Sequence, residues 1–469
     1  MKFTNLPDFL GYKDFKVNAQ VDKHTTCNIC FLIAPEKSED FLYAAEQRRA
    51  IEISSNTGDR IMDGIVSAVT IDYGMTSTMA NVTITSKSML LQETKEERIF
   101  QSPKKTYADI LQSFAELEIG KCDHIQDTIE EIIYQHHIDD FSFLLYLADK
   151  CSTGLWITED GKISFGPQNN AERINDSEKM YQKSILEKKI TVQRGNRDIC
   201  ILTMEQFLNG STIQYEQSDY TISHICVYEK CDDTYFQYMG STNPVFDAPE
   251  YSPEELVTTA KVTDNRDPDN LGRIQVKFLM FSDNDSEKMW IPYVVPFVGK
   301  NDGGVVMLPD VDDEVLICIS NGKPYALGSL RQHALPENCV DIDKKHICIK
   351  DSIITIDDNE VCTKQGKKAL CSVKSDAVAV AYDKSKITLN DGTVIAELEK
   401  SSITIASDSV KSETRKSKIH MNSDKIQCEN GNSQCSIKQN YVQLASGKSK
   451  LNLNNGKTEV VGSTIDLKN

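Results

Sequence analysis

Branched apolar residues return at a fixed interval from residue 375 onward, and this periodicity constrains the fold more than any other feature of the sequence. Two series each repeat every 16 residues and are offset by 9 and 7, so that an apolar centre returns about every eight residues. The first series is Val378, Val394, Val410, Ile426 and Val442, and the second is Ile387, Ile403, Ile419, Cys435, Leu451 and Leu467. Internal repetition at a short fixed period predicts strands stacked side by side.

A strand with only one or two apolar side chains cannot bury them alone, and these repeats hold too few apolar residues to fill a wide single-chain solenoid. We therefore expect three chains to intertwine as a triangular β-prism or β-helix, each burying its apolar positions at roughly 1.5–3 kcal/mol per side chain. About fifteen strands at about 4.7 Å spacing would make a shaft on the order of 70 Å long. A monomeric β-solenoid is the alternative. The predicted trimer core consists of Val378, Ile387, Val394, Ile403, Val410, Ile419, Ile426, Val442 and Leu451.

The charges divide the 469-residue chain into two parts. The whole sequence has 52 Lys+Arg against 70 Asp+Glu, a net charge of −18. Residues 336–469 hold 20 basic and 18 acidic residues, which leaves 32 against 52 for residues 1–335. The first part therefore carries the negative charge, and a surface of that kind repels phosphate backbones. No segment approaches the roughly 18 apolar residues of a membrane span, and the amino terminus lacks the apolar run of a secretory signal.

Residues 1–250 mix the patterns of strands and helices and predict an α+β region. Apolar residues at helical spacing predict one helix between Pro103 and Gly120, and a second is expected to follow Tyr134 and to end before Gly154. Residues 155–165 predict a hairpin that turns at 159–161. Residues 59–73 and 80–85 have the pattern of strands.

Residues 251–335 predict a small closed barrel. The turn-forming segment 264–270 leads into Arg273–Phe278, where polar and apolar residues alternate strictly. Residues 290–298 predict a further strand that Pro292 and Pro296 interrupt, and residues 314–319 and 325–330 predict two more. About five short strands within about 80 residues indicate an OB-type barrel. Residues 336–469 then form the repetitive shaft, so the chain is expected to be mainly β.

The barrel segment carries a family resemblance. Residues 264–278, Trp290, residues 309–315 and residues 321–330 closely resemble the OB-fold signature of VgrG spike proteins, which occur in type VI secretion systems, extracellular contractile injection particles and contractile phage tails. The barrel residues that carry the signature are Asp267, Pro268, Asp269, Leu271, Gly272, Arg273, Val276, Phe278, Trp290, Pro309 and Gly328. Residues 134–165 are similar to the hub motif of that family through Tyr134, Asp140, Phe141, Phe143 and Leu144.

The resemblance implies a structural role. It predicts a trimeric hub and spike that joins inner-tube and baseplate proteins at its N-terminal face to a PAAR-like tip protein or effectors at its C-terminal end. It would contact the target membrane only on firing, and would be assembled in the bacterial cytoplasm and released as part of the injection particle. The shaft departs from the family's Val-Gly repeats, and we expect neither an inserted lysozyme domain nor a fused effector, because the chain leaves no room for them.

The sequence shows none of the motifs by which common enzymes are recognised: HExxH, GxSxG, GxxxxGK[ST] and GxGxxG are all absent. Acidic runs such as Glu96-Glu97 and residues 312–314 are expected to be solvated, and His136-His137 lacks a third ligand nearby in the sequence. Cys27 and Cys30 lie in a β-like segment, so we expect packing residues rather than a zinc or redox site, and reduced thiols throughout. We predict no cofactor, no metal and no catalytic residue.

Two other functions stay open at this point. An OB barrel with a β-solenoid tail could bind nucleic acid or glycan, and a cell-wall-acting phage tail enzyme is a further alternative. Nucleic-acid binding requires a basic groove with aromatic residues for stacking. The predicted loops instead concentrate acidic residues, namely Asp264, Asp267, Asp269, Asp283, Asp285, Asp310, Asp312 and Asp313. Their charge argues against phosphate binding.

Overall fold

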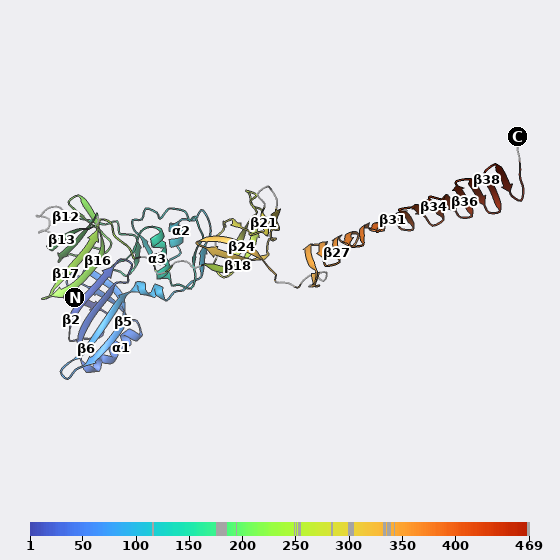
Figure 1. Ribbon diagram of the computed structural model, residues 1–469. Coiled ribbons are helices and arrows are strands. Elements are labelled where there is room, and N and C mark those ends of the chain that lie inside the picture. Colours follow the sequence, from blue (N-terminus) through green and yellow to red (C-terminus); the bar gives the residue numbers. More distant parts are fainter. Residues whose placement is uncertain are drawn as a thin grey trace. The chain divides into compact units, whose positions relative to one another are not determined.

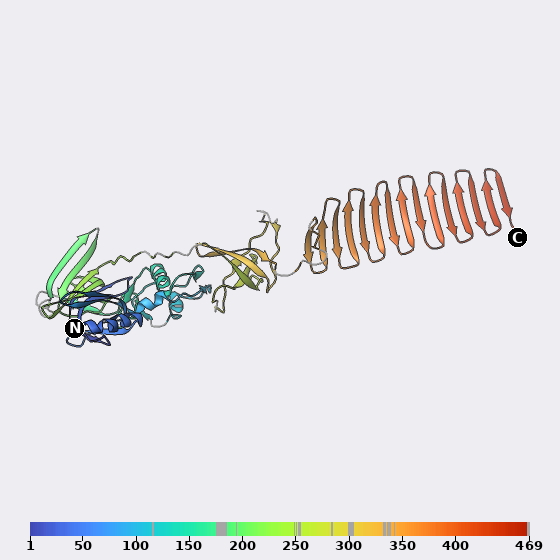
Figure 2. The same ribbon diagram turned by 90° about the horizontal axis from the view of Figure 1, so that it is seen from below.

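The computed structural model divides the chain into two compact units, residues 1–332 and 333–469, which are described separately (Figures 1 and 2). The structure describes all residues except 115–116, 175–184, 194, 248, 250, 252–254, 283–284, 299–303, 332–333, 335–338, 342 and 467–469, together with the side chains of 172–174. Asp283 and Leu467 therefore lie outside the described residues. No helix among the described residues is long and apolar enough to cross a bilayer.

A twelve-stranded sheet forms the larger part of the first unit. Its strands are β1 (Lys2–Thr4), β2 (Gly11–Gln20), β3 (Thr26–Ile33), β4 (Ala50–Ser54), β5 (Arg60–Tyr73), β6 (Thr78–Ser86), β12 (Ala171–Ile174), β13 (Ile185–Gln193), β14 (Asn196–Thr203), β15 (Thr212–Tyr215), β16 (Ser218–Lys230) and β17 (Asp233–Ser241). Strands β2 and β16, far apart in sequence, pair through Val17 and Val227 and join the two halves of the sheet. Strands β3, β5 and β6 confirm the predicted β segments.

One core cluster lies on this sheet, and a second surrounds helix α3. Phe31, Ile53, Ile84 and Tyr238 are fully buried in the first cluster, as is Cys27, which confirms that this cysteine serves packing. The remaining elements before residue 170 are η1 (Pro35–Lys37), α1 (Ser38–Glu46), η2 (Lys87–Gln92), β7 (Arg98–Phe100), α2 (Tyr107–Leu111), β8 (Leu117–Ile119), β9 (Ile133–Gln135), α3 (Asp140–Lys150), β10 (Leu155–Ile157) and β11 (Ile163–Phe165).

Helix α3 ends before Gly154 and β10 pairs antiparallel with β11, so both predictions are confirmed. The first predicted helix is shorter than expected and spans only Tyr107–Leu111. Thr106 and Asp109 form a reciprocal capping box, which starts α2 after Pro103 rather than at it. Trp156 of β10 is fully buried and donates from Nε1 to the carbonyl oxygen of Ile222 at 2.8 Å, which ties the hairpin to the large sheet.

A five-stranded sheet in the order β20-β19-β18-β23-β24 forms the barrel. Its strands are β18 (Leu256–Asp264), β19 (Arg273–Phe278), β20 (Ile291–Pro292), β23 (Glu314–Ser320) and β24 (Lys323–Leu330), and β21 (Phe297–Val298) pairs with β22 (Gly304–Val305) beside it. A parallel bridge between Tyr293 and Ala326 brings the two ends of the sheet together. The strand predicted over 290–298 is two short pieces instead, because Pro292 and Pro296 lack the N–H that a continuous ladder requires.

Residues 345–461 form a single fifteen-stranded antiparallel sheet in which every strand pairs with its neighbours in sequence (Figure 2). Its strands are β25 (Lys345–Ile349), β26 (Ser352–Ile356), β27 (Glu360–Gln365), β28 (Ala369–Lys374), β29 (Ala377–Tyr382), β30 (Ser385–Asn390), β31 (Thr393–Leu398), β32 (Ser401–Ala406), β33 (Ser409–Glu413), β34 (Ser417–Asn422), β35 (Lys425–Asn430), β36 (Ser433–Lys438), β37 (Tyr441–Ser446), β38 (Ser449–Asn454) and β39 (Lys457–Val461). From β29 onward a strand begins every eight residues, which confirms the period found in the sequence.

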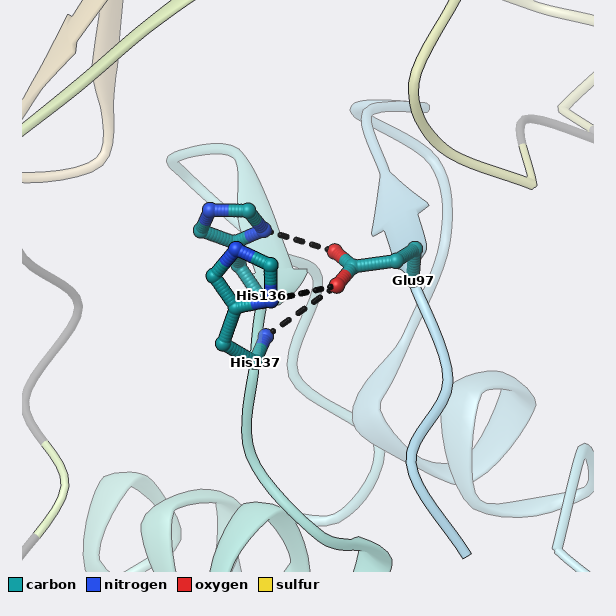
Figure 3. A group of neighbouring side chains, drawn as sticks. All are labelled: Glu97, His136 and His137. Atoms are coloured by element: carbon teal, nitrogen blue, oxygen red, sulfur yellow. Dashed lines mark hydrogen bonds and ion pairs between the residues drawn. The ribbon is translucent and has the colours of Figure 1, made fainter.

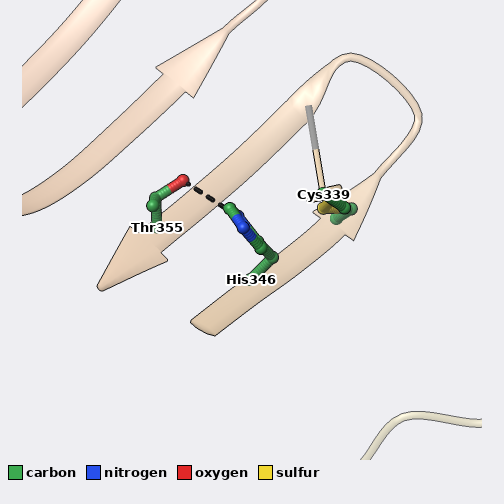
Figure 4. Close-up of a disulfide and its surroundings, with 4 residues drawn as sticks. Cys339, His346 and Thr355 are labelled. Carbon is green, nitrogen blue, oxygen red and sulfur yellow. Dashed lines mark hydrogen bonds between the residues drawn. A yellow bond between two sulfur atoms is a disulfide. The ribbon is translucent and has the colours of Figure 1, made fainter. Parts of the chain in front are cut away.

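The first strand of this sheet carries a disulfide. Cys348 of β25 is bonded to Cys339, close to the hydrogen bond between His346 and Thr355 (Figure 4). The other twelve cysteines are free. The expectation of reduced thiols throughout was therefore wrong for this pair, because the fold brings together two cysteines separated by nine positions in sequence.

We predict that Gly64→Ala destabilises the large sheet. A Cβ atom on Gly64 of β5 would lie 2.6 Å from the carbonyl oxygen of Thr85 and 2.8 Å from Cγ2 of Ile84, so the buried backbone must shift. Overpacking of this kind costs about 1–3 kcal/mol in free energy of unfolding. Gly11→Ala in β2 is the control, because nothing lies within 4 Å of its added Cβ. Equal denaturant midpoints for the two variants would contradict the prediction.

Candidate assembly surfaces

The fifteen-stranded sheet has one apolar face, which we call the apolar face of the shaft. Residues directly opposed in an antiparallel pair point to the same side, so the register defines two columns along the sheet. One column contains Val361, Val373, Val378, Leu389, Val394, Ile405, Val410, Met421, Ile426, Ile437, Val442 and Leu453. The other contains Cys371, Val380, Ile387, Ala396, Ile403, Ser412, Ile419, Cys428, Cys435, Leu444, Leu451 and Val460.

All nine shaft residues predicted from the sequence lie in these two columns. Within one chain they are only partly covered: Ile387 is 51%, Ile403 47% and Ile419 44% exposed. The apolar face thus presents many large apolar side chains that a single chain leaves in contact with water.

The opposite face of the same sheet is polar. Its central column runs through Thr388, Ile395, Thr404, Lys411, His420, Gln427, Ser436, Gln443, Asn452 and Glu459, so over these strands it is polar at every position except Ile395. Hydrogen bonds link neighbouring strands on this side: Tyr441 Oη and Gln443 Nε2 each donate to Oδ1 of Asn452 at 2.9 Å. One side of the sheet therefore suits solvent and the other suits an interior.

The apolar face is hollowed at its carboxyl-terminal end. A groove of about 870 Å³ is lined there by Ile419, Leu444, Leu451, Val460 and Ile465, among others. The directly opposed pair Cys428 and Cys435 lies in the same wall. The groove continues the apolar columns and belongs to the same surface.

The barrel signature is organised around one carboxylate. Both oxygens of Asp267 accept hydrogen bonds from the guanidinium of Arg273, at 2.7 and 2.9 Å, and the carboxylate also accepts from the backbone N–H groups of Asp269, Leu271 and Arg273. The hydrogen bonds from Arg273 hold the pKa of Asp267 far below its ordinary value. Asp267 thereby fixes the loop that leads into β19, in which Asn270 and Gly272 adopt positive φ angles.

The other signature residues serve the barrel in different ways. Val276 and Phe278 are fully buried in its core, and Pro309 is buried and accepts from Nδ2 of Asn265 at 2.8 Å. Gly328 lies at a bulge where the β23–β24 register shifts, and Trp290 is half-buried before β20. Leu271 is 70% exposed and Pro268 is also exposed, so these two residues contribute to the surface rather than to the core.

The residues of the predicted hub motif lie in two cores, the cluster around helix α3 and the core of the barrel. Asp140 is buried at the start of α3 and accepts hydrogen bonds from Arg98 at 2.6 Å and from Gln135 at 2.8 Å. Phe141, Phe143 and Leu144 pack in the cluster around α3. Tyr134 of β9 instead lies in the core of the barrel, where its ring makes an edge contact with Phe281 at 6.1 Å.

The acidic residues of the predicted loops differ in exposure. Asp285 is buried and accepts from the backbone N–H groups of Gln101 and Ser102, at 2.8 and 3.1 Å, and from Lys105. Burial raises its pKa, but these hydrogen bonds outweigh burial and leave the pKa below its ordinary value. The buried carboxylates of Asp267 and Asp285 are therefore used for structure.

The surroundings of His136 and His137 were not predicted from the sequence. Glu97, expected to be solvated, lies beside both imidazoles: its carboxylate is 2.7 Å from Nδ1 of His136 and 3.2 Å from Nδ1 of His137 (Figure 3). A third potential ligand is thus present although it is about 40 positions away in sequence. The only signal in the sequence was the histidine pair itself.

Comparison with known proteins gives one match to a family and several to solved structures. Among curated proteins, none matches this chain. An Escherichia coli protein described as a type VI secretion component similar to phage T4 tail proteins is 14% identical, with a TM-score of 0.46 over 70% of this chain and 99% of that one. The Francisella PdpA-VgrG complex in its lidded form gives 12% identity and a TM-score of 0.46 over 80% and 75%. A 43 kDa prophage tail protein of Shewanella oneidensis gives 10% identity and a TM-score of 0.37 over 49% and 94%.

We predict that Asp267→Asn lowers the thermal stability of the protein in a pH-dependent way. The pKa of this carboxyl is depressed in the folded state, so its stabilising effect is complete above the unfolded pKa of about 4 and fades as the pH falls below that value. The difference in melting temperature between wild type and variant should be constant from pH 7 to about 5 and shrink toward pH 3. A difference that grows on acidification would contradict this assignment.

The family match covers the barrel itself. Residues 258–330 match the model of the type VI secretion system and phage-baseplate injector OB domain. That range begins in β18 and ends with β24, and it includes the loop built on Asp267 and Arg273. The barrel of this chain is therefore similar to the injector OB domains, which confirms the resemblance to VgrG-like spike and hub proteins.

Proposed function

We propose that this protein is a structural subunit of the spike and hub of a contractile injection machine, and that three copies join through the apolar faces of their shafts. The observation that carries the proposal is the one-sided sheet of residues 345–461. Its apolar columns would be buried only by further protein, whereas its polar face can stay in contact with water.

The size of the apolar face supports an obligate assembly. Fifteen strands at about 4.8 Å spacing extend over roughly 70 Å, and two side-chain columns about 7 Å apart make a strip on the order of 700 Å². The largest apolar patch on a typical soluble monomer is about 300–600 Å². Large strips of this kind mark surfaces that other protein covers.

Three copies fit the shape of the strip better than one. A chain folded on itself would bring one part of the sheet over another, but every strand of this sheet pairs only with its neighbours in sequence. Copies that each supply one flat side can enclose a narrow interior about two residues wide. The resemblance to VgrG spike proteins suggests that the number of copies is three, because those proteins are trimeric.

The same resemblance suggests the partners. The N-terminal region would face inner-tube and baseplate proteins, and the carboxyl-terminal end of the shaft would carry a tip protein or effectors. The protein would be assembled in the cytoplasm and leave the cell with the particle. In this role it transmits axial force and turns over no substrate, so its action depends on the stiffness of the hydrogen-bonded ladder.

We predict that the purified full-length protein is a trimer. Light scattering coupled to size exclusion should give about three times the chain mass of 52.7 kDa, because separate chains would leave their apolar columns in water. The trimer should persist on dilution to nanomolar concentration. A mass near 50 kDa would refute the proposed assembly.

We further predict that Ile403→Asp prevents assembly. In the trimer the substitution places three carboxylates around one axis without partners, at a cost of several kcal/mol for each buried charge. Thr404→Asp is the matched control on the same strand, because residue 404 lies on the polar face opposite Lys411. Light scattering should show a monomer for Ile403→Asp and a trimer for Thr404→Asp. A stable trimer of this variant would count against the interface.

A further inference from the structure

We propose that Glu97, His136 and His137 form a binding site for a divalent transition metal ion, of which zinc is the best representative. Each residue offers one ligand atom, and the three atoms lie within 4.8 Å of one another. Nitrogen and carboxylate oxygen donors in this combination are typical of zinc sites with three protein ligands and an open position. The assignment is independent of the proposed function.

The strand pair β7–β9 places two of the ligands opposite each other. Arg98 pairs with Gln135 in this ladder, so the preceding Glu97 and the following His136 leave the ladder at the same end. Side chains alternate along a strand, and Arg98 accordingly points away from Glu97. Its guanidinium is engaged by Asp140 and Gln135, so this neighbouring positive charge is neutralised elsewhere.

The backbone at His137 adds the third ligand. Successive residues of an extended strand point to opposite sides, but His137 has a φ of +58°, an uncommon conformation for a residue other than glycine. This turn brings its imidazole back beside that of His136, with ring centroids 3.8 Å apart. Both Nδ1 atoms consequently face the same carboxylate, as Figure 3 shows.

The distances suit an ion after a small adjustment. Ligand atoms bound tetrahedrally to zinc at about 2.0–2.1 Å lie about 3.3 Å apart. Oε1 of Glu97 lies 3.2 Å from Nδ1 of His137, which already matches this spacing. The other oxygen, Oε2, lies 2.7 Å from Nδ1 of His136, so that pair must widen by about half an ångström. The backbone N–H of His137 also donates to Oε1 of Glu97 at 3.2 Å, which orients the carboxylate toward the imidazoles.

Burial differs among the three side chains in a way that leaves one side open. The side chains of His136 and Glu97 are 21% and 33% exposed, whereas that of His137 is 80% exposed. An ion could therefore enter from the side of His137, and water would complete its coordination there.

The site lies where the strand pair β7–β9 meets the barrel. Phe281 presents its ring to His136 at 5.9 Å, and the N–H of Ser282 donates to the carbonyl oxygen of Glu97 at 2.8 Å. An ion bound by Glu97 and both histidines would tie β7 and β9 together beside this junction. We infer that the metal acts as a clasp that stabilises the connection between hub and barrel.

Zinc titration of the full-length protein tests the site. The protein is first stripped with a chelator, and exposed thiols are alkylated so that cysteines do not compete. Calorimetry with zinc chloride should show one site per chain, and affinity should fall at least about tenfold in Glu97→Gln and in His137→Gln. His124→Gln is the matched control, because His124 is 55% exposed and does not belong to this cluster. Its Nδ1 atom lies 2.9 Å from the carboxylate of Asp127.

Two further readouts make the outcome decisive. Cobalt(II) should give the visible absorption of a low-coordinate site in the wild type and in His124→Gln but not in His137→Gln, and zinc should raise the melting temperature of the same two proteins only. His137 is largely exposed, so its substitution should leave folding intact, which the melting temperature without metal verifies. Zinc binding of equal affinity in the wild type and in His137→Gln, or no binding in either, would overturn the proposal.

Discussion

The one-sided antiparallel ladder of residues 345–461 is the constraint on which the rest of this structure depends. A strand and its turn together occupy eight residues, and side chains alternate with a period of two. Residues 16 positions apart therefore lie on the same face, in each second strand of the sheet. A shift of the register by a single residue would move the whole apolar column to the polar side. The strict repeat is what keeps Ile387, Ile403 and Ile419 in one line.

That geometry separates two kinds of stability within the same sheet. The strands pair with their neighbours within one chain, whereas the apolar columns stay partly exposed there. Such a division suits the proposed shaft, in which the ladder would resist bending along each side and side-chain packing would join the copies. The polar face, with Lys411, His420 and Asn452 in its central column, would face water in the proposed trimer.

In the first unit, the strand pair β7–β9 joins the region around helix α3 to the barrel. Tyr134 and Ile99 belong to the short hub strands β9 and β7, yet their side chains fill the barrel core, and the N–H of Ile132 donates to the carbonyl oxygen of Gly322 at 2.9 Å. The buried ion pair of Arg98 and Asp140 anchors the same strands to helix α3. One strand pair thus serves two cores and the proposed metal site.

Local patterns in the sequence determined the positions of most elements: the repeat located the shaft strands, the alternation of Arg273–Phe278 located β19, and the motif around Asp267 indicated an injector OB barrel. These features depend on residues that are neighbours in the chain, where spacing alone carries the information. The tertiary structure decided what joins distant residues: the pairing of β2 with β16 and the approach of Glu97 to His136 and His137. Contacts of this kind arise from chain packing across tens to hundreds of positions, and no local pattern records them.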